Sequence, residues 1–207
     1  MTVHDKQPCI KGFEHINRYW DRSHEQVAAK ILPGEFYVTR ESELITTVLG
    51  SCVSVCVYDP VLRIGGMNHF MLPSGNGMDL DIVGKSFRYG DVAMERMLNV
   101  LFTNGADRKR IVFKAFGGGH VMARMTDIGE LNIAFLKKFM SLEGYKLEAE
   151  DLSGPYPRKV VFFPETGRVL VKRLKAMHNN TIYERESSYE QQLRKPAEVE
   201  GDIDLFD

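Results

Sequence analysis

The sequence has few cysteines and no long apolar segment, and both features narrow the classes of protein to which it can belong. It contains 3 cysteines, which are Cys9, Cys52 and Cys56. A low, odd number in a chain whose N-terminus is polar and carries no export signal argues against a disulfide framework. No apolar run approaches the roughly 20 residues that a membrane-spanning helix needs. We therefore expect a cytoplasmic protein whose thiols stay reduced.

The sequence also lacks an excess of charge of one sign. Its formal net charge is −1, with 27% charged and 43% hydrophobic residues. Such a balance creates no field that would draw the chain toward nucleic acid or an anionic membrane. The composition is typical of a soluble globular protein, and 207 residues suffice for a domain with its own core.

The apolar pattern along the chain predicts more strand than helix. Helices are expected at about 91–103 and 129–142, where apolar residues recur near the 3.6-residue period. Strands are expected at 36–39, 44–49, 52–58, 64–72, 110–116, 146–152, 159–163 and 169–174. Most of these strands can pair as hairpins, so we expect an α/β (α+β) protein with largely antiparallel or mixed sheets in a layered sandwich.

Changes of composition divide the chain into three segments. Residues 1–32 form an N-terminal extension, partly helical or arm-like, which ends at Pro33-Gly34. Residues 33–174 carry the regular pattern and form the domain, with an exposed loop at 74–84. Residues 175–207 are polar and charged, and we expect a solvated C-terminal tail.

The segment from Thr46 to Pro73 carries the residues with chemical potential. A thiol hydrolase needs a cysteine of lowered pKa, a histidine within hydrogen-bond reach, a group that orients the histidine, and backbone N–H groups that face the developing oxyanion. Cys52 follows Gly50-Ser51, where the backbone can turn tightly and direct its N–H groups outward.

A hairpin predicts the partner of Cys52. If the turn at 59–63 pairs Val57 with Ile64, then Cys52 lies directly across from His69, and cross-strand partners have Cβ atoms about 4.5–5.5 Å apart. A slip of one residue would put the two side chains on opposite faces. Thr46 lies on the preceding strand, where its hydroxyl can accept the second imidazole N–H and fix the tautomer.

Other interpretations of the same residues are simpler. Most cysteines in strands are inert core residues, and a threonine there is an ordinary strand former. Cys52 and Cys56 suggest half of a metal site, but His69 is the only nearby histidine, so a tetrahedral zinc site lacks ligands. The Gly117–His120 segment lacks the lysine of a phosphate-binding loop. We therefore expect neither a metal nor a cofactor.

The motifs around this site resemble those of a known family. The segment LGSCVSVCVYDP, followed by GGMNHFMLP, closely resembles CheD, the chemoreceptor glutamine deamidases of bacterial chemotaxis. The likeness extends from about residue 33 to 174 and includes Phe116-Gly117-Gly118, Ile128-Gly129 with Asn132, and Thr166-Gly167. The sequence departs from the family at Asp151-Leu152-Ser153-Gly154, where the family usually has a second glycine in place of Ser153.

The resemblance implies a fold, a reaction and partners. The fold is a layered α/β/β sandwich, and the reaction is hydrolysis of a receptor glutamine amide to glutamate with release of ammonia. The family's Cys-His-Thr triad maps onto Cys52, His69 and Thr46; Thr47 is a neighbour, but the family threonine stands six residues before the cysteine. Expected partners are methyl-accepting chemotaxis receptors, which are the substrate, and a CheC-type phosphatase. The alternatives are a non-catalytic adaptor that binds receptor or phosphatase, and another thiol acyl-transfer enzyme.

Overall fold

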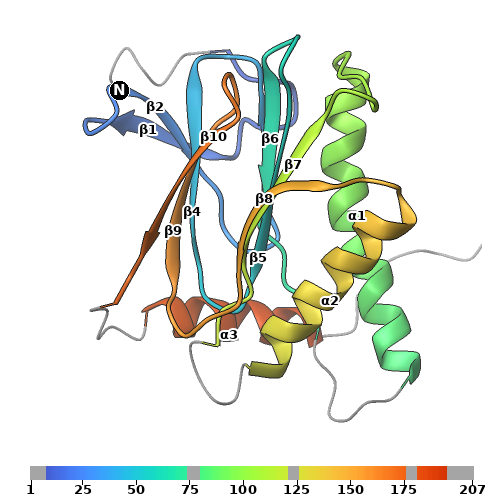
Figure 1. Ribbon diagram of the computed structural model, residues 1–207. Helices are drawn as coiled ribbons and strands as arrows, with labels where there is room; N and C mark the ends of the chain where they lie inside the picture. The colour runs from blue at the N-terminus through green and yellow to red at the C-terminus, as the bar shows by residue number, and fades with distance from the viewer. Residues whose placement is uncertain (1–7, 74–79, 121–125, 176–180, 195–207) are drawn as a thin grey trace, which may run out of the picture.

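The fold is built from two five-stranded sheets packed face to face, with two helices on the outer side of one of them. The computed structural model describes residues 8–73, 80–120, 126–175 and 181–194. These residues form ten strands and three helices. Figure 1 shows the three layers in order, with one sheet on the left, the second in the middle and the helices on the right.

The first sheet has the strand order β1-β2-β4-β9-β10. Strands β2 and β4 pair in parallel, and the other neighbours are antiparallel. Its strands are β1 (Asn17–Asp21), β2 (Gln26–Lys30), β4 (Glu43–Leu49), β9 (Arg158–Phe163) and β10 (Arg168–Arg173).

The second sheet has the order β3-β6-β5-β7-β8 and lies between the first sheet and the helices. Only β7 and β8 pair in parallel among its described strands. Its strands are β3 (Phe36–Thr39), β6 (Ile64–Asn68), β5 (Val53–Asp59), β7 (Val112–Gly117) and β8 (Leu147–Leu152).

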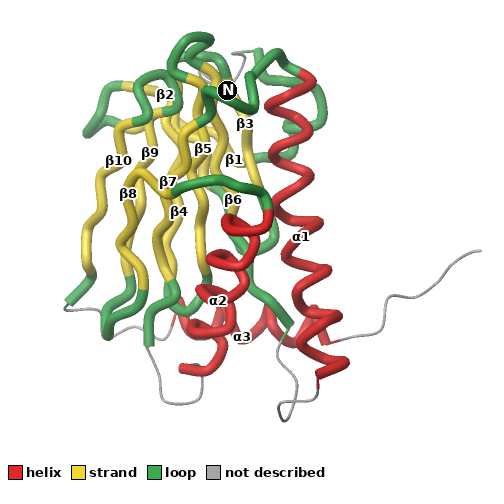
Figure 2. Tube along the Cα trace, turned by 45° about the vertical axis from the view of Figure 1, so that its right-hand side comes forward, coloured by secondary structure: helices red, strands yellow, loops and turns green. Residues whose placement is uncertain are grey.

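The helices take two different positions. Helices α1 (Leu80–Thr103) and α2 (Thr126–Leu142) cover the outer face of the second sheet, whereas α3 (Thr181–Arg194) crosses the lower end of the strands (Figure 2). None of the helices in the described ranges is long and apolar enough to cross a membrane. The expected layered α+β class, with sheets that are mostly antiparallel, is confirmed.

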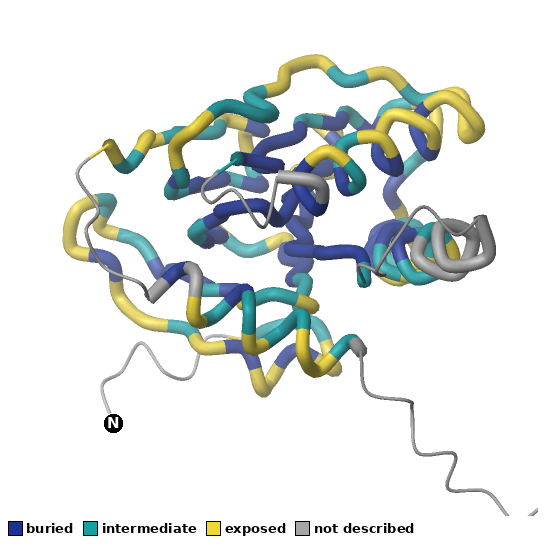
Figure 3. The backbone as a smooth tube through the Cα atoms, turned by 90° about the horizontal axis from the view of Figure 1, so that it is seen from below, coloured by how far each residue is buried: buried dark blue, intermediate teal, exposed yellow. Residues whose placement is uncertain are grey.

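The main core fills the space between the sheets and beneath α1 and α2. Seen from the side on which α3 lies, the buried backbone occupies the middle of the molecule, and the exposed segments surround it (Figure 3). A second, small cluster of Ala28, Leu44 and Val161 lies apart from this core. Because side chains alternate along a strand, Leu44 and Ile45 belong to opposite faces of β4, and Ile45 and Leu49 belong to the main core.

Two segments differ from their expected structure. Residues 16–31 are neither helix nor arm, because they supply β1 and β2 and bury Val27, Ala28 and Ala29 in the first sheet. Residues 181–194 are helical, although the whole segment after residue 175 was expected to be a solvated tail. Both segments are rich in polar residues, and the few apolar ones that anchor them to the core gave too weak a pattern.

Helix α1 is longer than the periodic pattern predicted. It begins at Leu80, so the helix includes residues 80–84 of the expected loop; residues 74–79 lie outside the described part of the chain. Met94, Met97, Leu98 and Leu101 face the core as expected, but Val92 is 52% exposed.

The backbone bends at Ser153-Gly154, where the sequence departs from the family pattern. Both residues have positive φ, 63° for Ser153 and 87° for Gly154, which is strained for serine and easy for glycine. The Ser153 N–H donates to the Gly117 carbonyl at 2.9 Å. The buried Arg158 side chain donates to the carbonyls of Gly117 and Ser153. These bonds hold the turn where a second glycine is usual.

Candidate active site

The loop from Gly50 to Cys52, the cysteine loop, joins β4 to β5 and so crosses from the first sheet to the second. Its three carbonyl groups all face protein donors. Gly119 N donates to Gly50 O at 2.8 Å, Gly118 N to Cys52 O at 2.7 Å, and Asn132 Nδ2 to Ser51 O at 2.9 Å. Consequently the N–H groups of the same three residues face the opposite side of the loop.

Gly117 allows this close approach. Its φ is 113°, and a Cβ there would overlap the Cys52 carbonyl oxygen. Asn132 is completely buried, and its Oδ1 also accepts a hydrogen bond from Leu72 N at 2.8 Å. The glycines after β7 and Asn132 therefore position the cysteine loop without contacting the reacting atoms.

Cys52 and His69 face each other between the two sheets. The observed hairpin pairs Asp59 with Ile64, so the register differs by two residues from the predicted one. A shift of two residues keeps every side chain on its face, and Cys52 and His69 become diagonal neighbours instead of direct ones. The Cys52 sulfur and a His69 ring nitrogen lie within 4.8 Å of each other.

The threonine that contacts His69 is Thr47, which corrects the expected pairing with Thr46. Thr47 Oγ1 lies 2.8 Å from His69 Nδ1, whereas Thr46 Oγ1 donates to the Val160 carbonyl at 2.9 Å. The reason is strand alternation: Thr47 shares its face of β4 with Ile45 and the inter-sheet core, and Thr46 shares the other face with Leu44.

The contacts of Thr47 fix the tautomer of His69. The Thr47 hydroxyl donates its single proton to the Ile31 carbonyl at 2.9 Å. The same oxygen must therefore accept the hydrogen bond from His69 Nδ1–H. Nε2 is then the unprotonated nitrogen, and it has no hydrogen-bond partner among the described residues. A proton acceptor thus remains available beside Cys52.

A fourth residue, Glu186 of α3, reaches the same point. Its carboxylate accepts hydrogen bonds from Gly50 N at 2.7 Å, Ser51 N at 2.9 Å, Ser51 Oγ at 2.7 Å and Cys52 N at 3.4 Å. The side chain is buried, with 1% exposure. Sequence reasoning missed Glu186 because it lies in the segment expected to be a solvated tail.

Burial and charge keep the thiol and the imidazole neutral in this arrangement. Burial raises the pKa of Cys52 well above its usual value, and the Glu186 charge, with the hydrogen bond to its carboxylate, raises it further. Burial, together with the positive charge of Arg185, lowers the pKa of His69 to about 3. The pair as it stands is therefore a thiol beside a neutral imidazole, not a thiolate–imidazolium pair.

Cys52, His69 and Glu186 also have the residue types of a metal site. Their ligand atoms lie within 4.8 Å of one another. However, both Glu186 oxygens already accept short hydrogen bonds from backbone N–H groups and Ser51, so their lone pairs face the loop. A carboxylate held by amide donors in this way fits an anion-binding site better than a cation site.

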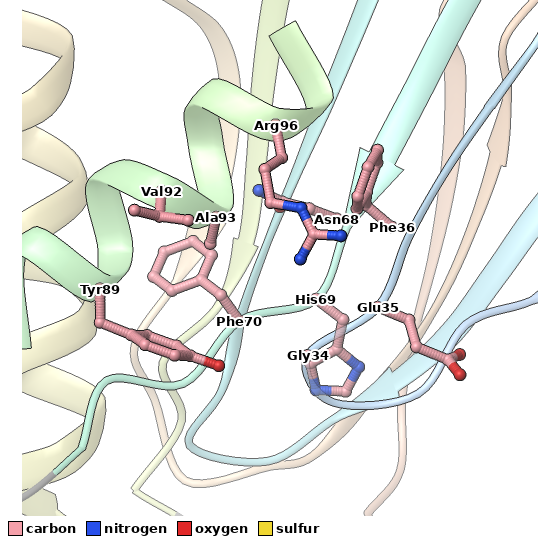
Figure 4. Close-up of a pocket in the computed structure, with 10 residues that line it drawn as sticks. All are labelled: Gly34, Glu35, Phe36, Asn68, His69, Phe70, Tyr89, Val92, Ala93 and Arg96. Atoms are coloured by element: carbon pink, nitrogen blue, oxygen red, sulfur yellow. The ribbon is translucent and has the colours of Figure 1, made fainter. Parts of the chain in front are cut away.

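A groove opens beside His69, between α1 and the strands β3 and β6 (Figure 4). Its wall on the helix side carries Tyr89, Val92, Ala93 and Arg96, and His69 lies on the opposite side. In Figure 4 the guanidinium of Arg96 and the hydroxyl of Tyr89 both extend toward the groove. His69 contributes to the lining of this groove, but its side chain is only 1% exposed.

Comparison with known proteins identifies the family. Residues 71–173 match the family model described as CheD chemotactic sensory transduction. A protein of Halorhodospira halophila, named probable chemoreceptor glutamine deamidase CheD, is 49% identical over 100% of this chain and 95% of its own length. The chain belongs to the CheD family.

Other relatives give the same result. A Methylobacillus flagellatus protein with the same name is 53% identical and covers 92% of this chain and 95% of its own length. A Shewanella oneidensis relative, named probable chemoreceptor glutamine deamidase CheD 1, is 50% identical over 92% of this chain and 93% of its own length. The family expected from the sequence is confirmed, and its members are named as enzymes.

Proposed function

We propose that this protein hydrolyses glutamine side-chain amides of chemoreceptors to glutamate, with release of ammonia. The observation that carries the proposal is the meeting of Cys52 and His69 within 4.8 Å, beside three backbone N–H groups that point at one carboxylate. A nucleophile, a base and a set of oxyanion donors are what amide hydrolysis by a thiol requires. The relatives named as chemoreceptor glutamine deamidases support the choice of substrate.

The first half of the reaction forms a thioester. His69 Nε2 takes the proton of the Cys52 thiol, and the thiolate attacks the carbonyl carbon of the glutamine side chain. The N–H groups of Gly50, Ser51 and Cys52 stabilise the oxyanion. The imidazolium then protonates the leaving nitrogen, which departs as ammonia. A water molecule activated by His69 hydrolyses the thioester and restores the thiol.

Thr47, not Thr46, takes the third position of the proposed triad. Its hydroxyl oxygen accepts a hydrogen bond from Nδ1–H and keeps Nε2 free to act as the base. A neutral oxygen in this position orients the ring and adds little charge stabilisation, so Thr47 is a positioning residue. Thr46 stabilises the pairing of β4 with β9 through its bond to Val160.

The expected partners and compartment belong to the same proposal. Methyl-accepting receptors present their cytoplasmic parts to the enzyme, so we place its work in the cytoplasm, with only peripheral contact with the membrane. A CheC-type phosphatase remains a predicted partner, and the absence of a metal or cofactor remains a prediction.

The test is a site-mapped assay on receptor cytoplasmic domains. We expect the wild-type chain to convert particular glutamines to glutamate and to release an equal amount of ammonia, and Cys52→Ala to do neither. The variant should remain folded, because alanine fits a buried site with the loss of only one sulfur atom. Conversion by Cys52→Ala at the wild-type rate would refute the assignment. Peptide cleavage or amine incorporation in place of ammonia release would indicate another thiol enzyme.

A further inference from the structure

Helix α3 buries one face against the loop that carries Cys52. Ile182, Glu186, Tyr189 and Leu193 follow each other at helical spacing, and all four are buried or partly buried. The exposed residues Glu184, Ser188, Gln191 and Gln192 lie between them in sequence. A face of this kind packs against a surface, and α3 lies across the lower ends of the strands (Figure 1). There Glu186 accepts hydrogen bonds from the backbone of the loop that carries Cys52.

The surface under α3 has room for two of these side chains because it carries glycine at the points of contact. A Cβ on Gly50 would lie 2.7 Å from a Glu186 carboxylate oxygen. A Cβ on Gly34 would overlap the Tyr189 ring. The Tyr189 hydroxyl forms a 2.6 Å hydrogen bond with the Tyr89 hydroxyl of α1, at the edge of the groove beside His69. The fit therefore extends over a whole helix face and does not rest on Glu186 alone.

The chemistry of Glu186 matches the product of the reaction. A glutamate side chain is what remains after a glutamine amide has been hydrolysed. The Glu186 carboxylate lies within 4.8 Å of the Cys52 sulfur and a His69 nitrogen, and it accepts the same backbone N–H groups that would stabilise the oxyanion. It thus occupies the position that a product carboxylate requires.

The docked helix also leaves no access for an external substrate. Cys52 is 0% exposed and His69 is 1% exposed. The negative charge of Glu186 lies beside the Cys52 thiol and favours its protonated form. Turnover of a receptor therefore requires α3 to leave.

We propose that α3 is a pseudo-product segment, a helix of the same chain that docks in the substrate site and presents Glu186 where the product glutamate lies. The inference rests on the proposed deamidase function and deepens it, because it makes the site self-blocked until a partner or receptor displaces α3.

A single substitution converts the blocking residue into a substrate. In Glu186→Gln, the Cys52 thiolate bonds to the side-chain carbonyl carbon at position 186, the C–N bond breaks, and ammonia leaves with the proton that His69 took. Water then hydrolyses the thioester to a carboxylate and a free thiol. We expect purified full-length Glu186→Gln to contain glutamate at position 186, as read by peptide mass spectrometry. The double variant Glu186→Gln, Cys52→Ala should keep the amide.

The external assay separates the two hypotheses. If Glu186→Gln keeps its amide while it still deamidates receptor domains, the pseudo-product inference is wrong and the proposed function stands. If position 186 keeps its amide and no receptor glutamine is converted, the proposed function itself is wrong. Conversion at position 186 that also occurs in the Cys52→Ala background would be spontaneous, and it would overturn the inference.

A second pair of variants tests the blocking without any turnover. In full-length Glu186→Ala we expect iodoacetamide to alkylate Cys52 about tenfold faster or more, because the helix loses its hydrogen bonds to the loop and opens more often. The matched control is Glu184→Ala, which removes an exposed carboxylate from the same helix. Equal alkylation rates in the two variants would contradict the inference.

Discussion

The side chains proposed to carry the chemistry lie on two sheets packed face to face, whereas the side chain that covers them comes from a polar helix at the end of those sheets. Cys52, His69 and Thr47 are held by strand pairing and by buried hydrogen bonds at every carbonyl of the cysteine loop. Helix α3 depends on Glu186, Tyr189 and a few apolar contacts. Changes to the sheets should therefore alter stability or turnover, and changes to α3 should alter access.

The largest effect on stability is expected at Asp59, in the turn that sets the hairpin register. Its buried carboxylate accepts Val61 N, Leu62 N, Asp107 N and the Arg110 guanidinium. Asp59→Asn should lower the free energy of unfolding by about 2–4 kcal/mol, because the buried donors lose a charged acceptor. Urea denaturation measures the change.

The matched control is Asp107→Asn, whose side chain is 42% exposed and pairs with the same Arg110. It should lower the free energy of unfolding by less than about 1 kcal/mol. An equal loss of stability in both variants would show that the turn at Asp59 does not stabilise the two sheets.

The same carboxylate predicts a pH dependence. Burial alone raises the pKa of Asp59, but the hydrogen bonds from Arg110 and three backbone N–H groups outweigh it and hold the pKa well below 3.8. Because the pKa of Asp59 is lower in the folded chain than in the unfolded chain, its ionised carboxylate contributes stability that is fully present above the unfolded-state pKa. This contribution is lost as the pH falls through the folded-state pKa. The acid-side loss of stability should be shallower in Asp59→Asn than in the wild-type chain. An equally steep loss of stability with falling pH in the two chains would contradict this role.

The next largest effect separates the two threonines. Thr47→Val should lower kcat by about 10- to 100-fold, because His69 loses the acceptor that fixes its tautomer. Thr46→Val should change kcat by less than about threefold, since its hydroxyl donates to the Val160 carbonyl and not to His69. Thr47→Ser keeps the hydroxyl and should restore most of the activity. A larger loss in Thr46→Val than in Thr47→Val would return Thr46 to the triad.

The sequence predicted that Cys52 and His69 share a face, but it did not predict which threonine contacts His69. The predicted hairpin pairing put Cys52 and His69 on one face, and a register error of two residues did not change that face. Along β4 both faces are apolar, with Leu44 on one and Ile45 on the other, so the pattern did not say which threonine faces His69. Only the packing of the two sheets against each other decides which threonine contacts His69.

The predictions for the segments near the two ends of the chain were wrong for a different reason. Strands β1 and β2 and helix α3 gain most of their stability from contacts with residues distant in sequence, such as β2 with β4 and Glu186 with the cysteine loop. A local pattern does not contain such contacts, and tertiary packing overrides a weak local preference.

A smaller effect is expected where α3 meets α1. Tyr189→Phe removes one hydroxyl of the Tyr89–Tyr189 pair, and it should speed alkylation of Cys52 by about two- to fivefold without lowering the stability of the sheets. Tyr89→Phe should give the same increase, and the double variant should add little, because both single changes break the same bond. Additive effects would show that the two hydroxyls act separately.

The smallest effect concerns the strained turn at residue 153. Ser153→Gly should raise the free energy of unfolding by about 0.5–1 kcal/mol, because glycine tolerates the φ of 63° without steric cost. Activity should not change. Gly154→Ser, at φ 87°, should lower stability instead, and thermal denaturation compares the two. A destabilised Ser153→Gly variant would show that the serine side chain supports the turn.

Amide hydrogen exchange on the wild-type chain, read by mass spectrometry, tests most directly the contrast between a rigid framework and a releasable helix. Peptides from α3 should exchange about 100-fold faster or more than peptides from β4 and β5, because the helix opens locally and the strands exchange only on global unfolding. Exchange of α3 at the same slow rate as β4 and β5 would show that the helix is a permanent part of the fold, and would contradict the account.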